Sequence, residues 1–165
     1  MRTILQTPRL VLREMTEDDA EHLLALSTPN VLRFVPGEPP VHNRDDALAV
    51  LRDRVFPQYA LGLGRWACVE RASGAFVGWS GIKLIDGEYD VGYRFLESAW
   101  GKGYASESAH AVCGFARERL RGKRVVGKAM HANVASKRVL EKAGLVYEGE
   151  ETIAEHVFAV YVLRV

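Results

Sequence analysis

A chain of 165 residues that is 48% hydrophobic is long enough for one domain with a substantial buried core. Its 22 basic and 21 acidic residues nearly cancel, which argues against nucleic acid or an anionic membrane surface as a partner. No apolar run approaches the roughly 18 residues of a membrane span, and residues 1–8 lack the apolar core of a signal peptide. We therefore expect a single domain over 1–165 that is cytoplasmic and is a monomer or homodimer. The cysteines, Cys68 and Cys113, are expected to be buried free thiols, with a disulfide as the alternative.

The first third of the chain predicts one strand followed by two helices. Residues 9–13 alternate charged and apolar side chains, which is typical of a strand. Acidic residues directly after Thr16 and after Asn43 predict two helix starts, because Thr and Asn cap helices and acids suit the positive end of the helix dipole. The connection over residues 29–40 carries four prolines and cannot be one regular element. It is either a loop that faces the substrate or a plain surface loop.

The middle of the chain changes to the period of strands. Strands are expected at 66–69, at 76–82 and at 89–95. The last two are separated by Asp86-Gly87, a dipeptide typical of hairpin turns. These strands predict an antiparallel meander.

The last third predicts two helices and three further strands. Apolar residues at helical spacing mark a helix over 105–120, and a strand follows at 124–130. A second helix over 133–143 ends at Gly144, and two strands close the chain. A strand, helix and strand in succession imply one parallel pair inside an otherwise antiparallel sheet.

A glycine-rich segment over residues 96–105 joins the meander to the next helix. The first amides of a helix have no internal partners, and the helix dipole favours negative charge there. Gly101 and Gly103 allow the backbone to approach a ligand closely. The segment therefore predicts a diphosphate-binding turn, with an ordinary strand-to-helix loop as the alternative.

Two other phosphate-binding motifs do not fit this segment. A P-loop requires G-x-x-x-x-G-K-[ST], which the chain lacks. A dinucleotide fingerprint requires an acidic residue about 20 positions further on, where this chain has Lys123-Arg124.

Two motifs together resemble the GCN5-related N-acetyltransferase (GNAT) superfamily. Residues 100–105, WGKGYA, resemble its pyrophosphate motif [RQ]-x-x-G-x-[GA]. Residues 133–145, NVASKRVLEKAGL, resemble its second signature, N-x-x-[AS]-x-x-x-x-x-K-x-G-[FL]. Residues 7–13 and 90–93 are similar to the branch that contains the ribosomal-protein N-terminal acetyltransferases.

The resemblance implies an α/β fold, α+β by some schemes, with a mixed, mostly antiparallel central sheet flanked by helices. The sheet is expected to split between the fourth strand, which ends at Leu96, and the fifth, which begins near Arg124. The implied reaction transfers acetyl from acetyl-CoA to an amine by direct attack in a ternary complex. The acceptor is a protein N-terminus or a small molecule, and no metal is expected.

The resemblance also assigns a set of residues to the cofactor. These are Phe95, Leu96, Trp100, Gly101, Lys102, Gly103, Tyr104, Ala105, Ser106, Asn133, Ser136 and Lys137. Asn133 is expected to hold the pantetheine amide, with a simple helix cap as the alternative. Lys102 and Lys137 are either phosphate contacts or solvated charges.

Two departures from the superfamily pattern affect the expected chemistry. Trp100 replaces the usual Gln or Arg, and an aromatic residue there is common in the ribosomal-protein branch. Leu140 replaces a tyrosine that serves many members as general acid, and Leu140 has no proton to give. The resemblance assigns that role to Ser136, whose alternative is a polar residue without chemistry.

The general base is open at this stage. Glu88 and Asp90 flank the middle strand, and His131 follows a strand expected to line the cleft. A histidine near neutral pKa is a suitable base, so His131 joins Ser136 and Asn133 as the predicted catalytic set. A chain of water molecules is the alternative. Two other functions remain open: a non-catalytic sensor of acetyl-CoA and an adaptor that binds no cofactor.

Overall fold

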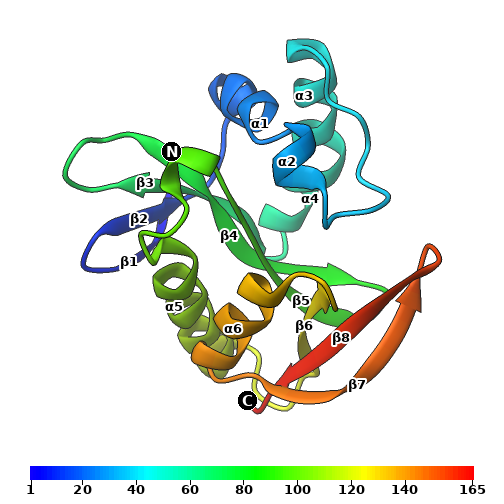
Figure 1. Cartoon of the computed structure of the whole chain (residues 1–165). Helices are drawn as coiled ribbons and strands as arrows, with labels where there is room; N and C mark the ends of the chain where they lie inside the picture. The colour runs from blue at the N-terminus through cyan, green and yellow to red at the C-terminus, as the bar shows by residue number, and fades with distance from the viewer.

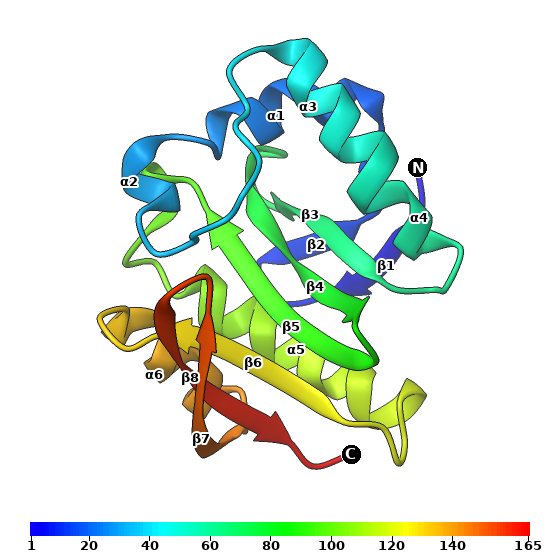
Figure 2. The same ribbon diagram turned by 90° about the vertical axis from the view of Figure 1, so that its right-hand side faces the viewer.

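A computed structural model describes residues 1–165. The chain forms one eight-stranded sheet with helices on both faces (Figures 1 and 2). The strands are β1 (Thr3–Gln6), β2 (Leu10–Arg13), β3 (Gly64–Glu70), β4 (Phe76–Ile85), β5 (Glu88–Phe95), β6 (Val125–Met130), β7 (Val146–Ile153) and β8 (His156–Leu163). The α-helices are α1 (Ala20–Ala25), α2 (Pro29–Leu32), α3 (Arg44–Val50), α4 (Phe56–Tyr59), α5 (Tyr104–Arg119) and α6 (Val134–Lys142). Shorter helical segments are η1 (Glu17–Asp19), η2 (Leu51–Val55) and η3 (Glu97–Ala99). No helix is long and apolar enough to cross a membrane.

The strand order of the sheet is β1-β2-β3-β4-β5-β6-β8-β7, and every neighbouring pair is antiparallel except β5 and β6. The parallel pairing of β5 with β6 begins at Tyr89 opposite Val125 and ends at Val91 opposite Gly127. Beyond that point the two strands separate, so the predicted split in a mostly antiparallel sheet is confirmed. The strand β1 was not predicted, and it makes the two separating strands the fifth and sixth.

Two hydrophobic cores lie on opposite faces of the sheet. In β3, Trp66 and Cys68 belong to the core under α5, whereas Ala67 between them belongs to the core under α1 and α3. This is the period of two expected for a strand that is covered on both faces. Both cysteines are buried and free, as predicted.

Local turn chemistry fixes the elements that border the split. Asp86 and Gly87 both have positive φ, 48° and 84°, which is the geometry of a tight hairpin turn between β4 and β5. Gly144 has φ 93° and ends α6, as predicted. The proline-rich connection contains only the short helix α2, which Thr28 caps by accepting from the Val31 amide. The rest of this connection passes over the sheet on the side opposite α5 (Figure 2).

Candidate active site

The segment between β5 and α5 has the geometry of an anion-binding turn. Gly101 and Gly103 have φ values of 73° and 82°, a region that side chains disfavour, and Gly103 is the residue that precedes α5. The backbone amides of Tyr104, Ala105 and Ser106 donate to no acceptor within the chain. Three free donors and the positive end of a 16-residue helix therefore converge on one point.

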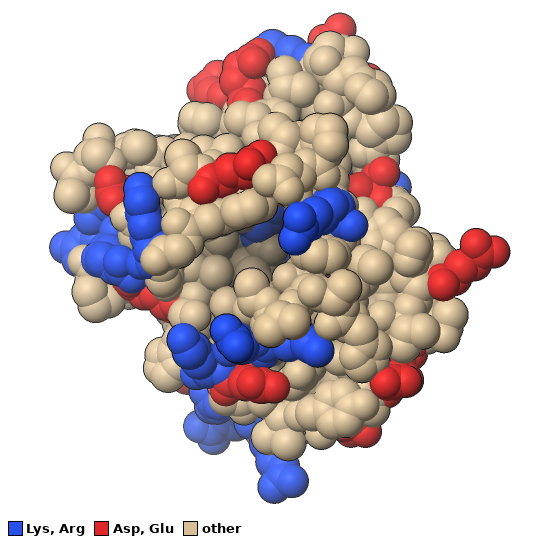
Figure 3. All heavy atoms as spheres, in the orientation of Figure 1, with Lys and Arg blue, Asp and Glu red and all other residues tan.

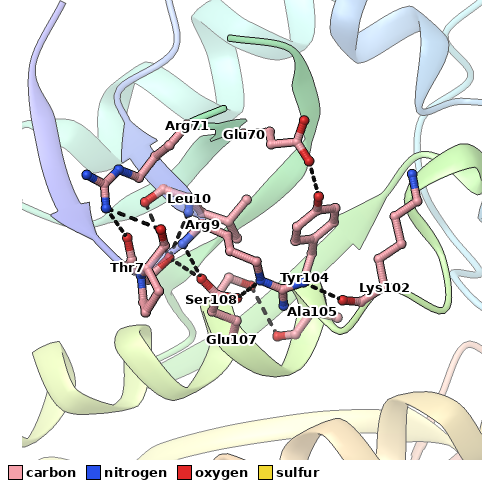
Figure 4. A network of polar contacts seen from close by, with 11 residues as sticks. Thr7, Arg9, Leu10, Glu70, Arg71, Lys102, Tyr104, Ala105, Glu107 and Ser108 are labelled. Atoms are coloured by element: carbon pink, nitrogen blue, oxygen red, sulfur yellow. Dashed lines mark hydrogen bonds and ion pairs between the residues drawn. The ribbon is translucent and has the colours of Figure 1, made fainter. Parts of the chain in front are cut away.

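The N-terminal segment holds this turn in place through Arg9 (Figure 4). Arg9 Nη1 donates to the Lys102 carbonyl at 2.8 Å, and Arg9 Nε lies 2.6 Å from Glu107 Oε2. The same guanidinium lies over the Tyr104 ring, 4.8 Å from its centroid. Thr7 Oγ1 donates to Glu107 Oε1 at 2.6 Å. Thr7 and Arg9 belong to the segment 7–13 that resembles the ribosomal-protein branch. They thus hold the turn between β5 and α5 in place.

The aromatic residues of the turn have structural contacts of their own. The Tyr104 side chain is buried and its hydroxyl donates to Glu70. Trp100 Nε1 donates to the Phe95 carbonyl at 2.9 Å, while its ring is half exposed. Lys102 is exposed, and Figure 4 shows its side chain directed away from Arg9.

A cavity of about 540 Å³ opens where the sheet splits. Its walls come from the connection around α2, from β4 and β5, and from β6, α6 and β8. Figure 3 shows the hollow in the face presented in Figure 1, with Lys and Arg side chains on more than one side of it. Among the predicted residues, Asn133 and Ser136 line this cavity.

Tyr93 and Ser136 face each other across the split. Tyr93 Oη donates to the Ser136 carbonyl at 2.8 Å and lies 2.9 Å from Ser136 Oγ. Burial raises the pKa of the Tyr93 phenol, which therefore keeps its proton at neutral pH. If the Tyr93 hydroxyl donates its proton to the Ser136 carbonyl, the Ser136 hydroxyl is the donor in the contact between Ser136 Oγ and Tyr93 Oη. The sequence analysis did not single out Tyr93, although a tyrosine on the strand that borders the split was a usable signal.

Asn133 is the N-cap of α6 in this structure. Its Oδ1 accepts from the Ser136 amide at 3.2 Å, which fixes the first turn of the helix. Leu140 is 1% exposed and belongs to the core. A Cβ at Gly127 would lie 2.4 Å from Leu140 Cδ2, so a glycine in β6 is what allows α6 to pack this closely.

The three candidate bases are each engaged in an ion pair. His131 Nε2 lies 2.7 Å from Glu150 Oε1, and the histidine is half exposed and does not line the cavity. Glu88 accepts hydrogen bonds from Arg124 and Lys128, which lower the pKa of its carboxyl. Asp90 Oδ2 lies 2.5 Å from Arg65 Nη2.

Three basic residues on the cavity floor were missed by the sequence analysis: Arg65, Lys83 and Arg94. Burial, followed by the neighbouring Arg65, lowers the pKa of Lys83 to about 8. Nothing local in the sequence marks these residues, because they come from three strands and meet only through strand register.

Residues 9–146 match the family model described as Acetyltransferase (GNAT) domain. The chain therefore belongs to the GNAT family, as its two motifs indicated, and is an acetyl-CoA-dependent N-acetyltransferase. It is 29% identical over 154 residues to the Uncharacterized N-acetyltransferase YoaA of Bacillus subtilis. The alignment covers 90% of this chain and 86% of the relative.

Solved structures show the same fold. A GNAT-family acetyltransferase from Bacillus anthracis aligns with a TM-score of 0.82 at 21% identity, over 97% of each chain. RimL, a ribosomal L7/L12 alpha-N-protein acetyltransferase solved with coenzyme A, aligns with a TM-score of 0.81 at 20% identity, over 98% of this chain and 97% of that chain.

Proposed function

We propose that this chain transfers acetyl from acetyl-CoA to a primary amine by direct attack in a ternary complex. The observation that carries the proposal is the end of β5–β6 pairing at Val91 and Gly127. Past this point, one backbone edge of β5 has no strand neighbour and borders the cavity. Acetyl-CoA supplies a thioester-activated acyl group, and the split gives an extended chain access to that edge.

The residues at the turn fit the diphosphate of coenzyme A. The free amides of Tyr104, Ala105 and Ser106 are donors for phosphate oxygens, and the two glycines with positive φ leave room for them. Lys102 and Lys137 add positive charge at this end of the split. The Leu96 amide donates to the Val77 carbonyl and the Phe95 carbonyl accepts from Trp100 Nε1, so these backbone groups are already engaged. The Asn133 side chain is the group that bonds the pantetheine amide in this proposal.

Ser136 serves as the proton donor to the departing thiolate in this proposal. Its hydroxyl lies in the split, on the first turn of α6. Tyr93 acts as a positioning residue, because its hydroxyl bonds both Ser136 oxygens and holds the serine at the gap. The amine attacks in its neutral form, and water in the open cavity accepts the proton that the amine loses.

A protein N-terminus is the first acceptor class to test. RimL, whose fold this chain shares, is described as an alpha-N-protein acetyltransferase. A small-molecule amine is the second class, since a cavity of about 540 Å³ has room for either.

The test is release of free coenzyme A thiol from acetyl-CoA in the presence of short peptides and small amines, with mass spectrometry of the acetylated product. Thermal unfolding with coenzyme A runs in parallel, since a ligand of the native state raises stability. We expect stabilisation together with acceptor-dependent thiol release. Stabilisation without turnover on any amine would identify a sensor domain instead, and the absence of both would contradict the proposal altogether.

A further inference from the structure

The floor of the cavity is a row of cations from three neighbouring strands, β3, β4 and β5. Strands β4 and β5 pair so that Trp79 lies opposite Arg94, Gly81 opposite Gly92, and Lys83 opposite Asp90. Alternate residues of a strand point to the same face. All three pairs therefore share the face that lines the cavity.

Arg65 of β3 fills the middle of this row. Its Nη1 donates to the carbonyls of Gly81 at 2.7 Å and Asp90 at 2.8 Å. A Cβ at Gly92 would lie 2.5 Å from Arg65 Nη2. The absence of a side chain at Gly92 thus leaves the space that the guanidinium occupies.

Arg94 lies at one end of the row, and its charged side chain is almost fully buried. Its side chain is 9% exposed, with Nη2 at 3.2 Å from Glu38 Oε1. The guanidinium carbons of Arg94 and Arg65 each lie 5.1 Å from the centroid of the Trp79 ring. Arg94 Nε is buried and has no hydrogen-bond partner. A buried charged donor without an acceptor is unfavourable, so this position gains stability from added negative charge nearby.

Lys83 occupies the other end and has no counter-ion. The other basic residues that line the cavity each have an acid within 4.0 Å: Arg65 has Asp90, Arg94 has Glu38, and Lys128 has Glu88 and Glu151. Lys83 makes no ion pair. Of the four cations that line the cavity, Lys83 is therefore the one without an ion-pair partner.

We propose that the acceptor is an amine that carries a carboxylate, and that this carboxylate pairs with Lys83. The inference rests on the proposed function, because it names the acceptor class of that same site. Such a carboxylate has two sources. One is the α-carboxylate of a free amino acid, and the other is the acidic side chain at the start of a peptide or protein.

Paired acceptors test the proposal and separate the two sources. The first pair is glutamine and glutamine amide, which each have a free α-amine and differ only in the α-carboxylate. The second pair is two short peptides that begin with Glu or with Gln and are otherwise identical. We expect kcat/KM for the acidic member of one pair to exceed that for the neutral member by about tenfold or more, as for a hydrogen-bonded charge. The pair that shows the preference identifies the source.

Lys83→Met should bring that ratio close to one, whereas the matched variant Lys83→Arg should keep most of it. A second readout needs no turnover: isothermal titration of the chain, saturated with coenzyme A, with the N-acetylated acid and the N-acetylated amide. We expect tighter binding of the acid, and loss of that difference in Lys83→Met.

The outcomes separate this inference from the function on which it rests. Turnover of acidic and neutral amines at equal kcat/KM overturns the inference and leaves the acetyltransferase proposal standing. Turnover of no amine overturns the proposed function, and equal binding of the two acetylated products then overturns the inference as well. A preference that persists in Lys83→Met also contradicts the assignment.

Discussion

The two ends of the split differ in the groups that they present: backbone groups at one end and side chains at the other. The proposed cofactor end is one continuous stretch of chain, residues 96–107, with free backbone amides and two glycines at positive φ. The proposed acceptor end is lined by side chains from several strands, from the connection around α2, and from α6. A backbone site tolerates changes in most of its side chains but not in its glycines. A side-chain site tolerates the reverse, and this difference is open to experiment.

Gly103→Val is expected to have the largest effect. A valine at φ 82° is strained, and its side chain occupies the place where the backbone approaches a phosphate. Loss of two charge-assisted hydrogen bonds, about 3 kcal/mol in total, raises the Kd for acetyl-CoA at least about a hundredfold by isothermal titration. The matched control is Gly122→Val, at φ 72° in a turn with open space around it. Equal affinities in the two folded variants would remove the turn from the site.

Ser136→Ala tests the side-chain end of the chemistry. General acid assistance is worth 10²–10⁴-fold, and the low pKa of a thiol points to about a hundredfold loss of kcat. The Kd for acetyl-CoA should barely change, since the interaction matters mainly in the transition state. Leu140 is the other α6 residue that lines the cavity, and its side chain has no proton to donate in place of Ser136. Full kcat in the variant would show that the thiolate leaves without this serine.

Tyr93→Phe separates positioning from proton donation. The variant keeps the ring and removes the hydroxyl that bonds Ser136. We expect kcat to fall about tenfold, less than in Ser136→Ala, because the two hydrogen bonds that position Ser136 are lost while the donor remains. In the double variant, Tyr93→Phe should add little to the loss from Ser136→Ala. Additive losses would mean that Tyr93 acts independently of the serine.

Asn133 has a structural role as the cap of α6 and a proposed role in binding the pantetheine amide. Asn133→Ala removes the helix cap and costs about 1 kcal/mol of stability, whereas Asn133→Ser keeps a cap. If the side chain also holds the pantetheine amide, both variants raise the Kd for acetyl-CoA by about twofold to tenfold. Parental affinity in Asn133→Ser would leave the residue as a cap alone.

His131→Gln is expected to have the smallest effect. The imidazole pairs with Glu150 and does not line the cavity, so kcat/KM should change by less than about twofold across the pH profile, well under the 10²-fold of a general base. The experiment is a comparison of pH–rate profiles for parent and variant. Loss of the acidic limb, in which activity rises with pH as a general base loses its proton, would restore His131 as the base.

The sequence was informative where a feature is local. Hydrophobic periods placed the helices and strands, and Asp86-Gly87 and Gly144 fixed their ends, because each depends only on neighbouring residues. The strand β1, which pairs with β2, was not predicted. Thr3–Gln6 is short and only half buried, so its hydrophobic pattern is too weak to detect.

The sequence by itself therefore determined the fold class and the family, and it predicted the glycine turn before α5, since glycine conformation and free helix amides are properties of a continuous stretch of chain. Only the tertiary structure decided which side chains meet. Tyr93 reaches Ser136 across 43 positions, and Arg65 reaches Asp90 across 25. The same register leaves Lys83 without a counter-ion on the cavity floor and turns His131 towards Glu150. Contacts of this kind follow from strand pairing and helix packing, and no local pattern of residues encodes them.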